Sequence, residues 1–399
     1  MARYLGFMGF AVAMLFIVVA GVNWVVDPYG VYRDYSLDDW KPHAATQGAL
    51  VKPYQVLRAA PRTLVLGNSR AEVGFDPQDA AWLASEQPVY NLALPGTGVR
   101  AARRLLEHTV SRHAIKRVVL GVDFMDFLVQ PSGQFLEPEL SGRLLLAPDG
   151  GLNTYRRLSM LKDGASTLIS LDALIHSLDT LRQHQKSGVA HLTSSGFNPM
   201  HDYGRMARAD GYYALFRQRD VENLQAYQQR PRHLFHAGTA TSPPLDDVAA
   251  IMQLAKQHGI QIDLVIYPYH AHLLEIFQLS GLWNVFEDWK RALVIRVESV
   301  GDARVNLWDF SGYHPYATEA VPAPGDRTTA VRWYWEAGHF KAALGHQVLD
   351  QLKTPDSNGF GIKLTPDNLE AQLERQREAG AIYRASPSAA LAELIATSR

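Results

Sequence analysis

The chain opens with a long apolar segment. Residues 5–26 carry no charged side chain and are rich in Phe, Val, Ala and Met. As a helix rising about 1.5 Å per residue they would span roughly 33 Å, which is enough to cross a hydrocarbon core of about 30 Å. The sequence Asp27-Pro28-Tyr29-Gly30 predicts a turn that ends this helix. Trp24 and Tyr29 would then lie at the level of the lipid headgroups.

Two other interpretations of this segment are a buried core helix and a cleaved signal peptide. A core helix is usually shorter, and a signal peptide has an apolar region of about 7–15 residues followed by a small-x-small cleavage site. The long run and the poor cleavage site at 18–21 favour an uncleaved transmembrane anchor over residues 1–28.

The charges that flank the anchor predict its orientation. Arg3 precedes the span, and four aspartates follow it, namely Asp27, Asp34, Asp38 and Asp39. The positive-inside rule then places the N-terminus in the cytoplasm. We therefore expect a single-pass inner-membrane protein whose larger part lies in the periplasm.

The rest of the chain alternates between short apolar runs and helical patterns. Five apolar runs bounded by turn residues predict buried strands at 62–67, 89–94, 117–123, 262–267 and 305–310. Helices are predicted at 76–85, 97–112, 243–258, 283–299 and 340–353. This alternation indicates an α/β fold, in which a mostly parallel sheet is covered by helices on both faces.

The rhythm is interrupted between the third and fourth strands. Residues 128–240 contain leucine-rich helical stretches (156–184) and a polar, Arg-rich stretch (197–236). We expect this insertion to form a cap or rim, because such sheets bind ligands at the carboxyl ends of their strands. An α/β domain would thus occupy 29–352. A linker at 353–359 and helices at 366–379 and 387–397 would form a C-terminal tail (353–399).

Composition narrows the class of protein. Apolar residues make up 47% of the chain and the net charge is −1, which is typical of a globular domain with a sizeable core. The sequence has no Lys/Arg-rich run, so nucleic acid is not an expected partner. With no cysteine, disulfides and thiolate metal sites are excluded.

A serine and a histidine stand out as candidates for chemistry. Ser69 follows the first strand on a sharp Gly-Asn-Ser turn, and Glu336 precedes His339 by three residues. A serine hydroxyl needs a nearby base to act as a nucleophile, and the base needs a carboxylate to orient it. Ser69, His339 and Glu336 fit these roles. Taken singly, such a serine more often caps a helix and such a histidine more often packs at the surface.

The same residues carry a family resemblance. Ser69 in Leu-Gly-Asn-Ser-Arg, Gly96 after the second strand, Asp123 after the third and Glu336-x-x-His339 together resemble the block pattern of the SGNH (GDSL-like) hydrolases over about 60–352. The resemblance implies a flavodoxin-like three-layer fold. The backbone N–H groups of Ser69 and Gly96 would stabilise the oxyanion. The chain looks most similar to the membrane-anchored branch that includes alginate acetylation and teichoic acid D-alanylation proteins.

Three positions depart from the family pattern. Glu336 replaces the usual aspartate, Asn68 replaces the aspartate of the GDSL signature, and Asp123 replaces an asparagine that donates to the oxyanion. An ionised aspartate cannot donate a hydrogen bond. Asp123 and Asp126 could instead pair with Arg70 or cap the next helix.

Several residues are candidates for substrate binding. Arg70 would hold an acidic sugar or only form a salt bridge. Tyr269 and His270 follow the fourth strand and would lie at the rim, and Trp333 and Trp335 would stack on sugar rings or pack in the core. His270 and His272 do not share a helix face, so no metal site is predicted.

The sequence thus predicts an acyl (acetyl) transferase that modifies an exported or cell-envelope polysaccharide through an acyl-Ser69 intermediate. No cofactor is expected. A membrane-bound acyltransferase would supply the acyl group, because acetyl-CoA is cytoplasmic. One alternative is a carbohydrate esterase. The other is a non-catalytic scaffold of a polysaccharide export complex, and the changes at Asp123 and Glu336 favour this second alternative.

Overall fold

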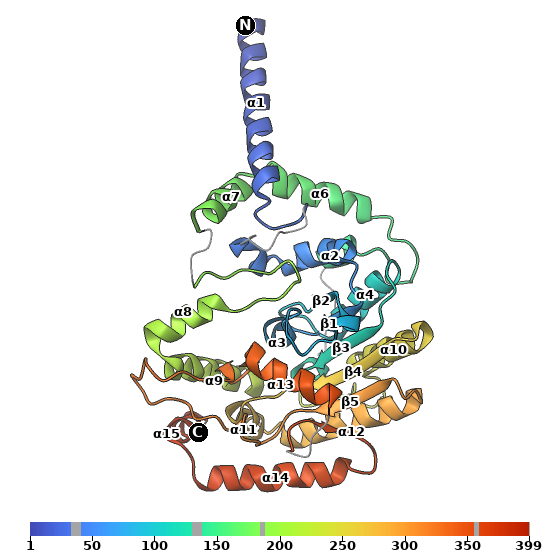
Figure 1. Ribbon diagram of the computed structural model, residues 1–399, viewed down its shortest axis with the longest axis vertical. Coiled ribbons are helices and arrows are strands. Elements are labelled where there is room, and N and C mark those ends of the chain that lie inside the picture. Colours follow the sequence, from blue (N-terminus) through green and yellow to red (C-terminus); the bar gives the residue numbers. More distant parts are fainter. Residues whose placement is uncertain (33–40, 130–137, 184–187, 355–358, 399) are drawn as a thin grey trace.

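The computed structural model describes residues 1–32, 41–129, 138–183, 188–354 and 359–398. Helix α1 (Ala2–Val26) projects from an α/β domain (Figure 1). It is long and apolar enough to cross a membrane. Residues 2–18 are all exposed, so α1 is not a core helix. The predicted turn at 27–30 is present, whereas Asp34, Asp38 and Asp39 lie outside the described residues.

A six-stranded sheet with the order β2-β1-β3-β4-β5-β8 forms the centre of the domain. The first five strands are parallel, and β8 pairs antiparallel with β5. Their bounds are β1 Thr63–Leu66, β2 Val89–Asn91, β3 Arg117–Val122, β4 Gln261–Ile266, β5 Val305–Asp309 and β8 Ile362–Lys363. All five predicted strands are confirmed. The parallel order 2-1-3-4-5 is that of flavodoxin-like sheets, with a switch point between β1 and β3.

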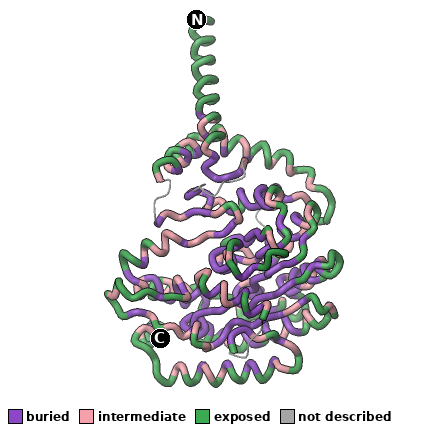
Figure 2. Tube along the Cα trace, in the orientation of Figure 1, coloured by how far each residue is buried: buried purple, intermediate pink, exposed green. Residues whose placement is uncertain are grey.

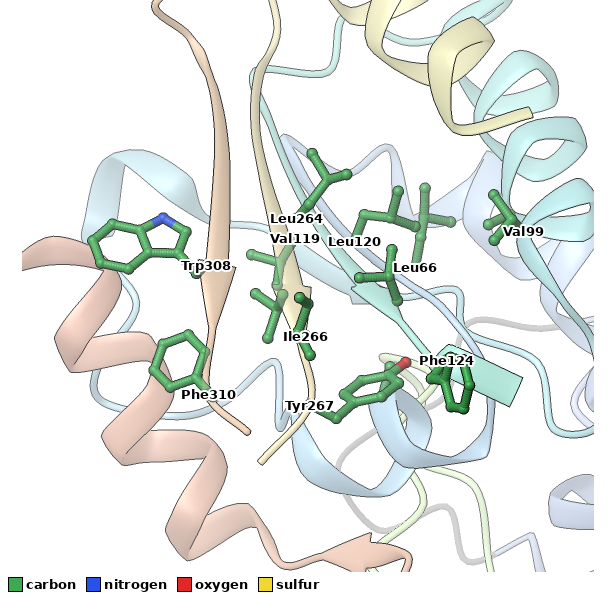
Figure 3. Packing of buried hydrophobic residues seen from close by; sticks show 14 of the residues in the cluster. Leu66, Val99, Val119, Leu120, Phe124, Leu264, Ile266, Tyr267, Trp308 and Phe310 are labelled. Carbon is green, nitrogen blue, oxygen red and sulfur yellow. The ribbon is translucent and has the colours of Figure 1, made fainter. Parts of the chain in front are cut away.

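Helices cover the two faces of the sheet. Helix α10 (Pro243–His258) packs against α4 (Val99–Val110) and α12 (Trp283–Val300), while α3 (Ser69–Gly74) packs against α13 (Ala342–Lys353). The strands are buried on both faces, which explains their continuous apolar runs. Figure 3 shows the core formed by residues of β1, β3, β4 and β5, with Phe124 and Tyr267 just beyond the strand ends.

The prediction of a helix at 76–85 is wrong. This segment forms turns and ends in the short 3-10 helix η2 (Ala84–Glu86). The carboxylate of Asp76 accepts from the amide of Gln78 at 2.9 Å, and that of Asp79 accepts from the amide of Ala81 at 2.7 Å. These local hydrogen bonds offer the backbone an alternative to a helix.

The insertion at 128–240 divides into two parts. Helices α6 (Arg156–Leu168) and α7 (Leu171–Gln183) lie at the base of α1 (Figure 1), not over the strand ends. Helices α8 (His201–Asp210) and α9 (Tyr212–Gln228) pack together, and α9 also packs against α11 (Ala271–Leu279) and β6 (Tyr334–Glu336). The expected rim is therefore formed by the second part alone. The other elements are η1 Pro42–Thr46, α2 Gly48–Ala59, η3 Phe124–Phe127, α5 Pro138–Arg143 and β7 His339–Phe340.

The segment after 352 packs into the domain. It contributes β8, α14 (Leu369–Ala385) and α15 (Ala389–Thr397); residues 355–358 of the predicted linker lie outside the described residues. The buried ammonium of Lys290 donates to Asp309 at 2.8 Å, to Ser311 at 2.8 Å and to Gln376 of α14 at 2.7 Å. A hydrogen-bonded charge in the core thus joins α12, β5 and α14.

Candidate active site

Ser69 is the first residue of α3 and stands directly beyond the end of β1. Asn68 caps this helix, because its side-chain oxygen accepts from the amide of Arg70 at 3.1 Å. Gly67 has a φ of +142°, and a Cβ at this position would lie 2.5 Å from the hydroxyl of Tyr267. Glycine is therefore required for the turn that presents the Ser69 hydroxyl.

His339 is delivered by a small antiparallel hairpin. Strands β6 and β7 are separated only by residues 337 and 338, so Glu336 and His339 face each other across the turn. His339 Nδ1 is hydrogen-bonded to Glu336 Oε1, and His339 Nε2 lies 2.9 Å from Ser69 Oγ. The Gly338 amide donates to the other oxygen of Glu336 at 2.7 Å. The structure therefore brings Ser69, His339 and Glu336 into one hydrogen-bonded series.

Electrostatics keep the Glu336 carboxylate ionised. Its burial favours the neutral acid, but the charge and hydrogen bond of His339, the Gly338 amide and nearby Arg70 outweigh burial and lower the pKa of Glu336 to about 2. Glu336 is buried, whereas Ser69 and His339 are half-buried, and the His339 side chain is 21% exposed. A small substrate can therefore reach the pair from solvent.

Asp123 forms an ion pair with Arg70, the residue that follows Ser69. One of its oxygens is paired with the guanidinium of Arg70 and accepts from Asn68 at 2.8 Å, and the other accepts from the hydroxyl of Tyr269 at 2.9 Å. Arg70 also donates to the carbonyl of Gly338 at 2.8 Å. The structure thus gives Arg70 the salt-bridge role, and this buried side chain fixes α3 to the hairpin that carries His339.

Asp126 extends this buried network. It accepts from Asn68 at 3.1 Å. Burial raises the pKa of Asp126 to about 6, against the lowering effects of Arg70 and the Asn68 hydrogen bond. Asn68 therefore holds the two carboxylates of Asp123 and Asp126 beside Ser69.

The expectation that Tyr269 and His270 lie at the rim is wrong. Tyr269 is 1% exposed and His270 is fully buried. The ring of His270 is hydrogen-bonded to the carbonyl of Glu319 at 2.9 Å, and burial lowers the pKa of His270 to about 3. After β4 the chain turns inward, because the amide of Ala271 donates to the carbonyl of Ala317 at 2.8 Å.

His272 has an acidic partner that sequence spacing did not indicate. Its Nδ1 lies 2.7 Å from Asp220 of α9, and both side chains are buried. Within the described ranges, no cluster of three or more His, Cys, Asp or Glu side chains that could hold a metal ion is found.

Trp333 directly precedes strand β6 and Trp335 lies within it, and both are half-buried. The ring of Trp333 packs edge-on against Tyr316, and the ammonium of Lys341 lies 4.4 Å from the ring centre of Trp335. Glu319 braces this strand, since its carboxylate accepts from the amides of Arg332 at 2.6 Å and Trp333 at 2.8 Å.

Gly96 lies on the loop after β2, next to the nucleophile turn. The amide of Leu94 donates to the carbonyl of Gly67 at 3.0 Å, which fixes the start of this loop beside Ser69. Gly96 is exposed, has a φ of +71° and leaves open space where a Cβ would stand. Among the described residues, neither the Ser69 nor the Gly96 amide donates to another residue of the protein. Both amides are thus free to bind a substrate oxygen.

No protein-family model matches the chain, and a search of curated proteins finds no match. The assignment of roles therefore rests on the geometry of the site.

Proposed function

We propose that this chain is a membrane-anchored acyltransferase of the SGNH (GDSL-like) type. It would transfer an acyl group such as acetyl to a hydroxyl of an exported or cell-envelope polysaccharide. The observation that carries the proposal is the hydrogen-bonded series from Ser69 Oγ through His339 to the buried Glu336. The flavodoxin-like strand order and the placement of Ser69 beyond a strand end agree with the family fold.

In the first half of the reaction the Ser69 oxygen attacks the acyl carbonyl carbon. His339 Nε2 takes the hydroxyl proton as the new C–O bond forms, and ionised Glu336 stabilises the resulting imidazolium. The negative charge on the former carbonyl oxygen would be bound by the amides of Ser69 and Gly96. The intermediate collapses, the bond to the leaving group breaks, and His339 returns its proton to the departing oxygen.

In the second half a polysaccharide hydroxyl attacks the acyl-Ser69 ester. His339 removes the proton of this hydroxyl, and the same amides bind the second oxyanion. Collapse releases the acylated sugar and returns the proton to Ser69. The ester bond is exchanged for another ester bond, so no oxidant, metal or cofactor is needed.

Glu336 and Asp123, the two departures from the family pattern that favour a non-catalytic scaffold, are both compatible with an acyl-serine mechanism. Glu336 has an extra methylene, yet its carboxylate is in contact with His339 and is fixed by the Gly338 amide. Asp123 cannot donate to an oxyanion, but the Arg70 guanidinium neutralises the charge that would oppose one.

Location supports transfer to an exported polymer. Helix α1 would tether the site to the inner membrane, and Arg3 favours a cytoplasmic N-terminus with the domain in the periplasm. Acetyl-CoA does not reach that side, so a membrane-bound acyltransferase would supply the acyl group. An alkaline phosphatase fused to the C-terminal end should be active in the periplasm; an inactive but stable fusion would contradict this orientation.

The proposal is tested with full-length protein in detergent and a chromogenic acetyl ester. Wild type should release the chromophore and gain the mass of one acetyl group, whereas Ser69→Ala should do neither. Ser299→Ala is the matched control, because this serine is exposed and its hydroxyl donates to the carbonyl of Arg296 on its own helix. Equal activity of Ser69→Ala and wild type would rule out the acyl-serine mechanism.

The partial exposure of Ser69 and His339 supports a second candidate, a carbohydrate esterase, because water can reach the acyl-enzyme. The two functions share the first half-reaction and differ in the acceptor. Oligosaccharides added to the acetyl-ester assay should accelerate turnover and become acetylated if the protein is a transferase. Release of acetate alone from an acetylated glycan would favour the esterase.

A further inference from the structure

Helices α6 and α7 have their apolar side chains on the outside. Beyond α1, fourteen large apolar side chains of the described residues are exposed, and ten of them lie between positions 152 and 181. They are Leu152, Tyr155, Leu158, Met160, Leu161, Ile169, Leu171, Ile175, Leu178 and Leu181, and each is more than two-fifths exposed. A monomeric soluble protein rarely exposes a patch of this size.

The buried face of these helices is polar. Apart from Ala173, the buried residues of the two helices are all polar: Asp163, Thr167, Ser177 and Thr180. Asp163 is bound by Arg143 at 2.7 Å and by the hydroxyl of Tyr54 at 2.7 Å. Leu158 and Leu161 of α6 are three residues apart, and the four exposed apolar residues of α7 recur every three or four residues, so those of each helix form a stripe on one face. The polarity is thus the reverse of that of a surface helix in water.

Both helices are joined to α1. The side chain of Asn23 donates to the carbonyl of Leu168 at the end of α6 at 2.8 Å and accepts from Ser177 of α7 at 2.8 Å. Asn23 is fully buried at this junction. Figure 2 shows exposed positions along α1 and along the two helices at its base. The exposed apolar residues of α1 therefore lie on helices that adjoin the stripe on α6 and α7.

The exposed length of α1 determines where its junction with α6 and α7 lies relative to a membrane. Residues 2–18 are exposed, and seventeen residues rise roughly 26 Å, which is less than a hydrocarbon core of about 30 Å. If α1 crosses a membrane, its junction with α6 and α7 must lie at the lipid boundary. Arg157, Lys162 and Arg182 are exposed beside the stripe, where long basic side chains can extend to the headgroups.

We propose that α6 and α7 form an interfacial lipid-binding platform, whose apolar stripe is immersed in the same membrane leaflet that α1 enters. The platform holds the domain against the bilayer in one orientation instead of leaving it on a flexible tether. This inference rests on the proposed function only in that α1 crosses a membrane; it makes no use of the chemistry at Ser69.

The test uses the absence of cysteine in the chain. Single cysteines are introduced as Leu161→Cys on α6 and Leu178→Cys on α7, with Phe10→Cys in α1 as the positive control. Ile295→Cys and Ile382→Cys are matched controls, because these exposed apolar residues lie elsewhere on the domain. Each full-length variant is labelled with an environment-sensitive fluorophore and placed in liposomes that contain brominated lipid and no other protein.

Labels at 161 and 178 should lose about half of their fluorescence, as expected for side chains 5–10 Å inside the headgroup boundary. Bromine near the headgroups should quench them more than bromine near the acyl ends. Labels at 295 and 382 should be unaffected. If the labels at 161 and 178 are quenched no more than those at 295 and 382, the platform is overturned. This result is expected if the stripe binds another membrane protein instead of lipid. Loss of quenching at position 10 would instead refute the anchor, and acetyl-ester turnover reports on Ser69 separately.

Discussion

The buried pair of Arg70 and Asp123 allows a quantitative test of the site. Arg70→Gln removes the cation and leaves the Asp123 carboxylate buried beside the nucleophile. Asp123→Asn leaves the guanidinium without its counter-charge. The double variant Arg70→Gln/Asp123→Asn replaces the ion pair with two amides that can hydrogen-bond to each other.

The expected change in the free energy of unfolding follows from the hydrogen-bond partners that each variant retains. Removing one member of a buried ion pair costs about 3–5 kcal/mol. Asn68 and Tyr269 would still donate to Asp123, so Arg70→Gln should cost about 3 kcal/mol, at the lower end of this range. Asp123→Asn should cost a similar amount. Because the double variant removes both charges of this pair, it should be no less stable than either single variant, which gives a coupling energy of about 3 kcal/mol.

The free energy of unfolding would be measured by urea titration of the full-length protein in detergent, with tryptophan fluorescence as the signal. The control cycle is Arg291→Gln with Glu370→Gln, an ion pair at the surface with a distance of 2.7 Å. Its coupling should be within experimental error, because exposed pairs contribute little. Additive effects at Arg70 and Asp123 would refute the reasoning, since the two charges would then not compensate each other.

Three further predictions concern the triad and its turn. Glu336→Gln should lower kcat for the acetyl ester by about 10⁴-fold, because an amide favours the wrong imidazole tautomer; a loss below about tenfold would mean that another acid orients His339. The pKa of Glu336 is lowered from 4.5 to about 2, so the folded state binds fewer protons than the unfolded state. Stability of about 3 kcal/mol should therefore be lost as the pH falls from about 4.5 to about 2, and Glu336→Gln should flatten this part of an acid titration. Gly67→Ala should lower the free energy of unfolding by at least about 2 kcal/mol, because the new Cβ combines a positive φ with a clash against Tyr267. Gly96→Ala is the control and should cost about 1 kcal/mol, because its Cβ would enter open space. Thermal unfolding measures both.

The sheet and the position of Ser69 beyond a strand end were predictable because local signals and tertiary context agree. The runs at 117–123 and 262–267 are apolar, rich in branched side chains and bounded by turn residues, and a strand fully buried on both faces requires that pattern. Ser69 and His339 were found because each lies in a short motif at an element boundary. Their distance of 2.9 Å depends on 270 residues of intervening chain that no local pattern describes.

The predictions from sequence failed where tertiary contacts, and not local sequence, decide whether a residue is buried or exposed. Periodicity at 156–184 indicates an apolar face but not what covers that face, and the structure leaves it exposed. Tyr269 and His270 follow a strand, yet contacts with 317–319 turn them inward. The pairing of His272 with Asp220 joins positions 52 residues apart, for which spacing gives no signal.

The bond between Lys290 and Gln376 imposes an order on biosynthesis. The two residues are separated by 86 positions, and at about 5–20 residues per second a ribosome needs roughly 4–17 s to make the intervening chain. During this interval α12 and β5 exist without the amide oxygen of Gln376, so the buried Lys290 ammonium has Asp309 and Ser311 as acceptors but lacks the acceptor that α14 supplies. Helix α1 is made first and would already be engaged by the insertion machinery. The domain thus completes its fold late, when most of the chain has been delivered, and a nascent chain stalled before α14 would expose an incomplete core to proteolysis.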